Sequence, residues 1–122
     1  MIVGVRVLTY SIPENGSLKG KRAIVKSAIE RASGRFNAAV AEVGAHDEHR
    51  RAVVGVSVLS TSKAHAARML DEVQALLDRA EGWIPLSQRT ELVPIGVDAT
   101  ATMGDDLEWT DFDDDEDDTD GR

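Results

Sequence analysis

Residues 36–60, FNAAVAEVGAHDEHRRAVVGVSVLS, decide the fold, because two β-type segments here flank a short polar connection. Apolar residues recur at every second position, at Phe36, Ala38 and Val40 in the first segment and at Val54, Val56 and Val58 in the second. This period of two predicts strands over Phe36–Val43 and Ala52–Ser60. The eight residues between them are too few for a parallel crossover, so the strands are predicted to pair antiparallel.

A helix is predicted on each side of this hairpin. Residues 18–33 follow the N-cap residue Ser17 and place their apolar side chains within about 140° of helical arc, at roughly 100° per residue. These side chains are Leu18, Ile24, Val25, Ala28, Ile29 and Ala32. After the hairpin, Thr61 or Ser62 caps a second helix, which Gly82 ends. The apolar side chains of this helix also share one face, and they are Ala66, Met69, Leu70, Val73, Leu76, Leu77 and Ala80.

Two outer strands complete the order. In residues 2–12 the apolar positions change parity between Val7 and Leu8, which indicates a bulge there or a strand buried on both faces. Near the other end, apolar and polar residues alternate over Glu91, Val93, Ile95 and Val97. Pro94 lacks an amide donor, so this last strand is predicted at a sheet edge. The order β-α-β-β-α-β predicts an α+β, ferredoxin-like fold, with two helices on one face of a four-stranded antiparallel sheet.

Charge divides the 122 residues into two regions. Residues 105–122 hold eleven acids and one base, whereas the rest of the chain holds thirteen bases and eleven acids. We therefore predict a folded domain over residues 1–98 and a disordered acidic tail over residues 99–122. Trp109 and Phe112 are aromatic exceptions in this tail. The tail is interpreted as a solubilising appendage, or else as a segment that binds the basic body or another protein.

The sequence also predicts the cellular compartment and whether the protein is an enzyme. It has no Cys, no long apolar run and no basic leader, so we expect a cytoplasmic protein without disulfides or a membrane span. The glycine-rich phosphate motifs, the G-x-S-x-G elbow and H-E-x-x-H are absent, and nothing pairs a nucleophile with a base. We expect no enzyme, no cofactor and no small-molecule substrate.

The strongest candidate for a binding site is the basic side of the first predicted helix. Three of its cations lie within about 60° of one another, on one flank of the apolar arc. A row of cations can track phosphates, so RNA binding is predicted. The predicted RNA-binding residues are Lys19, Lys21, Arg22, Lys26, Arg50 and Arg51. The alternative is an ordinary solvated helix face.

The hairpin connection contains residue types that can bind a metal ion. The hairpin connection carries His46, Asp47, Glu48 and His49, side chains of the kinds that ligate divalent ions. Their spacing matches no defined metal motif, and an exposed polar turn explains the same residues, so no metal site is predicted. His65, at the edge of the second helix's apolar arc, is predicted to be a partly buried structural residue.

Two features suit a protein partner. Residues 83–86, Trp-Ile-Pro-Leu, either close the core below the second helix, which we favour, or form an exposed patch. The valine-rich strands also leave the sheet face without helices to be covered. Pairing at a sheet edge or packing through this open face would form a homodimer.

Three stretches resemble a known bacterial family, the YlxP-like proteins, which carry a domain of unknown function. These stretches are MIVGVRVLTYSIP, SLKGKRAIVKSAIERASGRFNAAVAEV and RRAVVGVSVLSTSKAHAARMLDEV, and together they span roughly residues 1–95. The resemblance implies a ferredoxin-like fold, and the family's gene neighbourhood hints at RNA or ribosome work. The family supplies no catalytic residues to transfer. The acidic tail and the Gly-Ala-His loop depart from its pattern.

The leading interpretation is a small cytoplasmic, non-catalytic protein that associates with RNA or ribosomal particles through its basic helix. The alternative is a homodimeric protein-interaction module with no nucleic-acid role. The acidic tail, tethered to the basic body, is further expected to compete with phosphates at low ionic strength.

Overall fold

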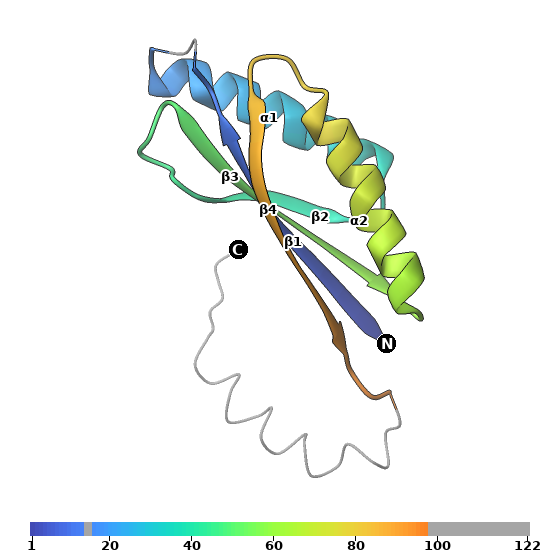
Figure 1. Ribbon diagram of the computed structural model, residues 1–122. Helices are drawn as coiled ribbons and strands as arrows, with labels where there is room; N and C mark the ends of the chain where they lie inside the picture. The colour runs from blue at the N-terminus through green and yellow to red at the C-terminus, as the bar shows by residue number, and fades with distance from the viewer. Residues whose placement is uncertain (14–15, 98–122) are drawn as a thin grey trace, which may run out of the picture.

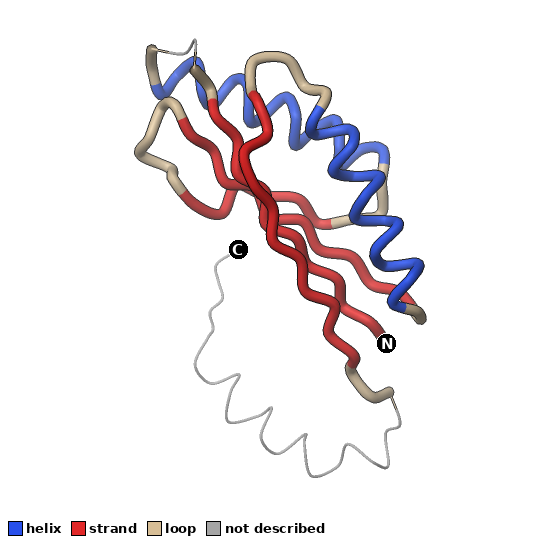
Figure 2. The backbone as a smooth tube through the Cα atoms, viewed as in Figure 1, coloured by secondary structure: helices blue, strands red, loops and turns tan. Residues whose placement is uncertain are grey.

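The computed structural model describes residues 1–13 and 16–97 and contains six elements in the predicted order (Figure 1). The elements are β1 (Ile2–Ser11), α1 (Leu18–Arg35), β2 (Ala39–Gly44), β3 (Arg51–Ser60), α2 (Lys63–Asp78) and β4 (Ile84–Pro94). They form a four-stranded antiparallel sheet in the order β2-β3-β1-β4. Both helices lie on the same side of this sheet (Figure 2). The predicted α+β, ferredoxin-like fold is confirmed, and β2 and β4 are the edges.

β1 alternates without interruption, contrary to the predicted parity change. Its even-numbered positions are buried under the helices, whereas the odd-numbered positions are half-buried on the other face. Of the two predicted alternatives, a bulge near Val7–Leu8 or burial on both faces, neither holds in full: the register shift lies between Thr9 and Tyr10, in the pairing with β4, and the second face is only half-buried. Valines occupy both faces because β-branched side chains suit any pleated surface, whether or not a helix covers it. Apolarity alone therefore does not identify the covered face.

The edge strands differ most from their predicted bounds. β2 begins at Ala39 rather than Phe36, and its pairing with β3 ends on a bulge between Glu42 and Gly44. β4 begins at Ile84, seven residues before the predicted start at Glu91, and ends at Pro94. It pairs with β1 along the whole length of that strand. An edge strand needs no strict apolar alternation, because backbone hydrogen bonds to one neighbour hold it.

The core fills the space between the covered face of the sheet and the two helices. Tyr10 and Trp83 stack with their ring centroids 4.0 Å apart and their planes 10° apart. Trp83 Nε1 donates to the Leu77 carbonyl oxygen over 2.8 Å, so its polar group is satisfied inside the core. Ile84 and Leu86 are exposed. The predicted closure of the core by residues 83–86 thus holds for Trp83 alone.

Both helices begin after predicted N-cap residues, but α2 ends at Asp78, four residues before the predicted terminator Gly82. The Ser17 hydroxyl accepts from the Gly20 amide, and the Ser62 hydroxyl accepts from the His65 amide, which selects Ser62 over Thr61 as the second cap. Beyond α2, Gly82 has φ +103°, and a Cβ there would lie 2.9 Å from Ile24. Glycine is therefore needed at this turn, both for its backbone angle and for its close approach to α1.

No helix among residues 1–13 and 16–97 is long and apolar enough to cross a membrane. The predicted disordered tail, with Trp109 and Phe112, lies outside the described residues.

Trp83→Ala is expected to lower the free energy of unfolding by about 3–5 kcal/mol, because it removes a buried ring and its stack on Tyr10. Ile84→Ala, at the exposed neighbouring position, is the matched control and is expected to change stability by about 0.5 kcal/mol or less. Urea denaturation followed by far-UV circular dichroism measures both. Equal losses in the two variants would contradict the buried role of Trp83.

A candidate nucleic-acid interface on α1

Three of the predicted cations form one exposed flank of α1. Lys19, Arg22 and Lys26 project from the first half of the helix, and all three are exposed. Within residues 1–13 and 16–97, the ion pairs present use other cations, so these three have no acidic partner. A cation with no ion-pair partner keeps its charge available for a phosphate. We call Lys19, Arg22 and Lys26 the basic flank.

The basic flank borders a groove between α1 and the edge strand β2. The groove has a volume of about 440 Å³ and is lined by Arg22, Val25, Lys26, Ile29, Glu30 and Glu42. Val25 and Ile29 supply apolar surface in this groove, beside Arg22 and Lys26. Cations beside an apolar floor suit a ligand that has both negative charge and flat apolar parts, as an unpaired nucleotide does.

Lys21 does not belong to this surface, which corrects its place among the predicted RNA-binding residues. Its side chain is 2% exposed. Its Nζ lies 3.0 Å from a carboxylate oxygen of Glu42 and donates to the carbonyl oxygens of Glu48, over 2.8 Å, and Ala45. A buried ammonium needs such a set of acceptors, because it has lost its hydration. Lys21 therefore ties α1 to β2 and to the loop after it.

The two remaining predicted cations lie in different places: Arg50 is in the hairpin loop, and Arg51 is the first residue of β3. Arg50 is exposed in the loop that Lys21 holds against α1, and its carbonyl oxygen accepts from the Ile12 amide over 2.8 Å. Arg51 begins β3 at a position that shares the helix-free face with Val53. Its guanidinium makes two hydrogen bonds to the Glu48 carboxylate, at 2.9 and 3.0 Å. Arg51 therefore lies away from the basic flank.

The carboxylate of Glu48 is held by its two hydrogen bonds to Arg51. The hydrogen bonds from the guanidinium lower the pKa of the Glu48 carboxyl below its ordinary value, and the charges of Arg51 and Lys21 act in the same direction. The carboxylate is thus held in its charged form, and any stability it contributes is lost as the pH falls through this lowered pKa. Glu48 acts as an anchor of the loop rather than as a free ligand.

The histidines contribute no assembled metal site in the part of the chain that the structure describes. No group of three or more His, Asp or Glu side chains there is placed to hold an ion. His46 is exposed and His49 is half-buried. His65 is also exposed, which overturns the predicted partial burial: its Nδ1 lies 2.7 Å from the Ser60 hydroxyl, across the turn into α2.

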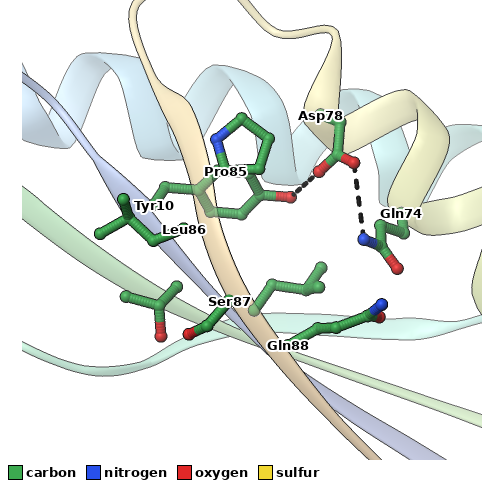
Figure 3. Close-up of a pocket in the computed structure, with 9 residues that line it drawn as sticks. Tyr10, Gln74, Asp78, Pro85, Leu86, Ser87 and Gln88 are labelled. Atoms are coloured by element: carbon green, nitrogen blue, oxygen red, sulfur yellow. Dashed lines mark hydrogen bonds between the residues drawn. The ribbon is translucent and has the colours of Figure 1, made fainter.

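A second pocket lies between α2 and β4 (Figure 3). Its volume is about 190 Å³, below the roughly 300–1,000 Å³ of most ligand sites. The Tyr10 hydroxyl donates to Asp78 over 2.7 Å, and Gln74 lies beside the same carboxylate. Burial, followed by this hydrogen bond, raises the pKa of Tyr10 above its ordinary value of 10.0. The side chains of Tyr10, Gln74 and Asp78 are therefore hydrogen-bonded to one another in this pocket.

A buried arginine near this pocket has no counterpart in the sequence predictions. Arg6 lies under α2, where it donates to Thr90 over 2.7 Å and to Asp71 and Gln74 over 2.8 Å each. These bonds join β1, β4 and α2. Its place at an even-numbered position between Ile2 and Leu8 is a signal that it faces the core. The spacing of Lys21 with Val25, Ala28 and Ala32, on one helical stripe, is the equivalent signal for Lys21.

The fold and this site define a small ferredoxin-like domain with a basic helix. The family described as "Protein of unknown function (DUF503)" matches residues 3–89, so the chain belongs to this family. The "Uncharacterized protein YlxP" of Bacillus subtilis (strain 168) is 34% identical over 77 residues, which cover 63% of this chain and 84% of that protein. The resemblance to YlxP-like proteins is confirmed.

Lys21→Ala is expected to lower the free energy of unfolding by about 3–5 kcal/mol, because it leaves Glu42 and two loop carbonyls without their buried partner. Lys19→Ala removes the same charge two residues away, on the exposed flank, and is expected to cost about 0.5 kcal/mol or less. Chemical denaturation of both variants provides the measurement. A Lys21 variant as stable as the Lys19 variant would show that the buried contacts contribute nothing.

Proposed function

We propose that the protein is a non-catalytic RNA-binding protein that associates with RNA or ribosomal particles through the basic flank of α1. The observation that carries this proposal is that Lys19, Arg22 and Lys26 are exposed together without an acidic partner among the described residues. A protein that needed these charges for its own stability would pair them, as it pairs Arg6 and Lys21. Unpaired cations in a row are suited to phosphates.

The groove between α1 and β2 indicates how the RNA would contact the protein. The basic flank would neutralise successive phosphates, while the apolar floor at Val25 and Ile29 would contact an unstacked base or a ribose. The guanidinium of Arg22 is a flat group on which a base can stack. Arg50 is exposed in the loop anchored by Lys21 and would add positive charge to this surface. Binding of this type follows charge and shape rather than base sequence.

The sheet itself does not supply the usual platform for RNA. RNA-recognition motifs of related topology stack bases on aromatic residues of the open sheet face. On that face, β1 and β3 of this protein carry aliphatic and small side chains, with Arg51 at the start of β3, and no aromatic residue. The proposed contact therefore lies on the helix side of the molecule, at its β2 edge.

A second function is favoured by a different observation. The helix-free face of the sheet has exposed apolar residues, among them Val43, Leu59 and Val93. Exposed aliphatic groups on a flat surface mark a protein contact. We therefore keep, as the alternative, a homodimeric interaction module with no nucleic-acid role. Such a module would show the mass of two chains in solution and no affinity for RNA, which light scattering and fluorescence anisotropy measure.

Replacing Lys19, Arg22 and Lys26 together by Ala is expected to weaken binding to a structured ribosomal RNA fragment by at least about tenfold, because up to three phosphate contacts are lost. The logarithm of the association constant decreases with the logarithm of the salt concentration, and the magnitude of this negative slope should become smaller by about 2–3. Fluorescence anisotropy at several salt concentrations measures both quantities.

The matched control is the triple Ala variant at Lys63, Arg68 and Arg79, three exposed cations of α2 and its C-terminal cap. It removes the same net charge from another surface. Equal weakening in the two triple variants would mean that only net charge matters. No loss in the α1 variant would refute the proposed site.

Deleting residues 105–122 is expected to strengthen RNA binding at low ionic strength, because eleven tethered acids compete with phosphates for the basic flank. The difference should disappear at high salt, where the charges are screened. Anisotropy titrations of the full and shortened chains test this. Unchanged affinity at low salt would show that these acids do not compete.

A further inference from the structure

The helix-free face of the sheet has an apolar centre formed by β1, β2 and β3. The cross-strand pairings place Val3, Val5 and Val7 of β1 beside Leu59, Ser57 and Gly55 of β3. Val43 of β2 packs over Gly55, where an added Cβ would come within 2.9 Å of it. Leu59 is 61% exposed, although it is a large aliphatic residue on the central strand β3. Nothing in the described chain covers this surface, and its exposed aliphatic area raises the free energy of the isolated domain.

The β4 side of the same face carries one charge of each sign. Glu91 lies beside Val5 in the pairing register, and Arg89 lies beside Val7. The two side chains form an ion pair over 3.2 Å, and they are 61% and 80% exposed. An exposed pair of this kind contributes little to the stability of a single chain. Its opposite charges, two residues apart on one strand, are however self-complementary under a two-fold rotation.

We propose that this face binds the same face of a second copy of the chain, through a two-fold axis that crosses the strands between the Val5 and Val7 rows. This axis places Arg89 of each copy opposite Glu91 of the other. It stacks the two valine-rich centres, as in a β-sandwich formed by two sheets. The proposal rests on the second function above and is independent of RNA binding, because the basic flank lies on the opposite, helix side of the sheet.

The size of the face agrees with a second copy as the occupant. The four strands contain 10, 6, 10 and 11 residues. At about 3.3 Å per residue and 4.8 Å per strand, the face covers on the order of 600 Å². Two such faces bury about 1,200 Å², which is the lower limit for a specific interface. We therefore expect a dimer that dissociates in the micromolar range rather than an obligate one.

Charge also favours this occupant over nucleic acid. The described residues of the helix-free face include Arg51, Arg89 and Glu91, and both arginines are already paired with acids. A flat aliphatic surface with balanced charges offers no row of cations to a phosphate backbone. It does offer a second copy matching aliphatic area, together with two charge pairs at its rim.

The test is sedimentation equilibrium of the full chain over about 1–200 μM, a range centred on the expected dissociation constant. Arg89→Glu is expected to raise the dissociation constant at least about tenfold, because it brings Glu next to Glu91 across the interface. The double variant R89E/E91R restores the opposite charges and is expected to return the constant to within about threefold of the original. Circular dichroism melts confirm that both variants remain folded.

Leu59→Asp and Leu86→Asp provide a matched pair on the two sides of the sheet. Leu86 is 59% exposed, nearly the same as Leu59, but it lines the pocket between α2 and β4. Leu59→Asp should abolish the dimer, and Leu86→Asp should leave it unchanged. A monomer at every concentration overturns the proposal, and so does a dimer that is insensitive to both R89E and Leu59→Asp. A dimer with no RNA affinity upholds this inference while refuting the RNA proposal, so the two failures are distinguishable.

Discussion

The sheet is covered by helices on one face only, and this constraint governs most of the molecule. Because side chains alternate along a strand, each strand sends half of its residues to a packed core and half to a surface with no cover. On the packed side, charged residues persist only where partners surround them, as Arg6 is bonded to three side chains. On the other side, valines remain half-buried at best. The two proposed interaction surfaces lie on these two sides.

Lys21 shows how a buried charge organises a surface that it does not join. Its ammonium holds Glu42 and two loop carbonyls, and so positions the hairpin loop beside the first turn of α1. Its helical neighbours Lys19 and Arg22 keep their charges free of ion pairs within the described residues. Within a single helical turn, the lysine at 21 is buried and stabilises the fold, whereas the lysine at 19 is exposed to solvent. The difference depends on the direction in which each side chain leaves the helix.

Periodicity in the sequence was sufficient for the element order and the antiparallel hairpin, and Pro94 for the edge position of β4. It was insufficient where a residue's environment depends on a distant partner. Arg51 is close in sequence to Arg50, yet it faces the other side of the sheet because it is the first residue of β3. His65 was predicted to be partly buried from its place on the helical arc, but it lies at the exposed first turn of α2. The first residues of β4 show no alternation of apolar and polar side chains in the sequence, because backbone pairing with β1 does not require it.

The sequence by itself determined the fold class, because local periods of two and 3.6 residues, together with capping and turn residues, specify strands and helices and their order. It also determined the family, through stretches that span most of the domain. Only the tertiary structure decided which cations are free and which are buried, and which of two equally apolar valine sets is covered. Those outcomes depend on contacts between residues far apart in the chain, and a local pattern carries no information about a partner tens of residues away.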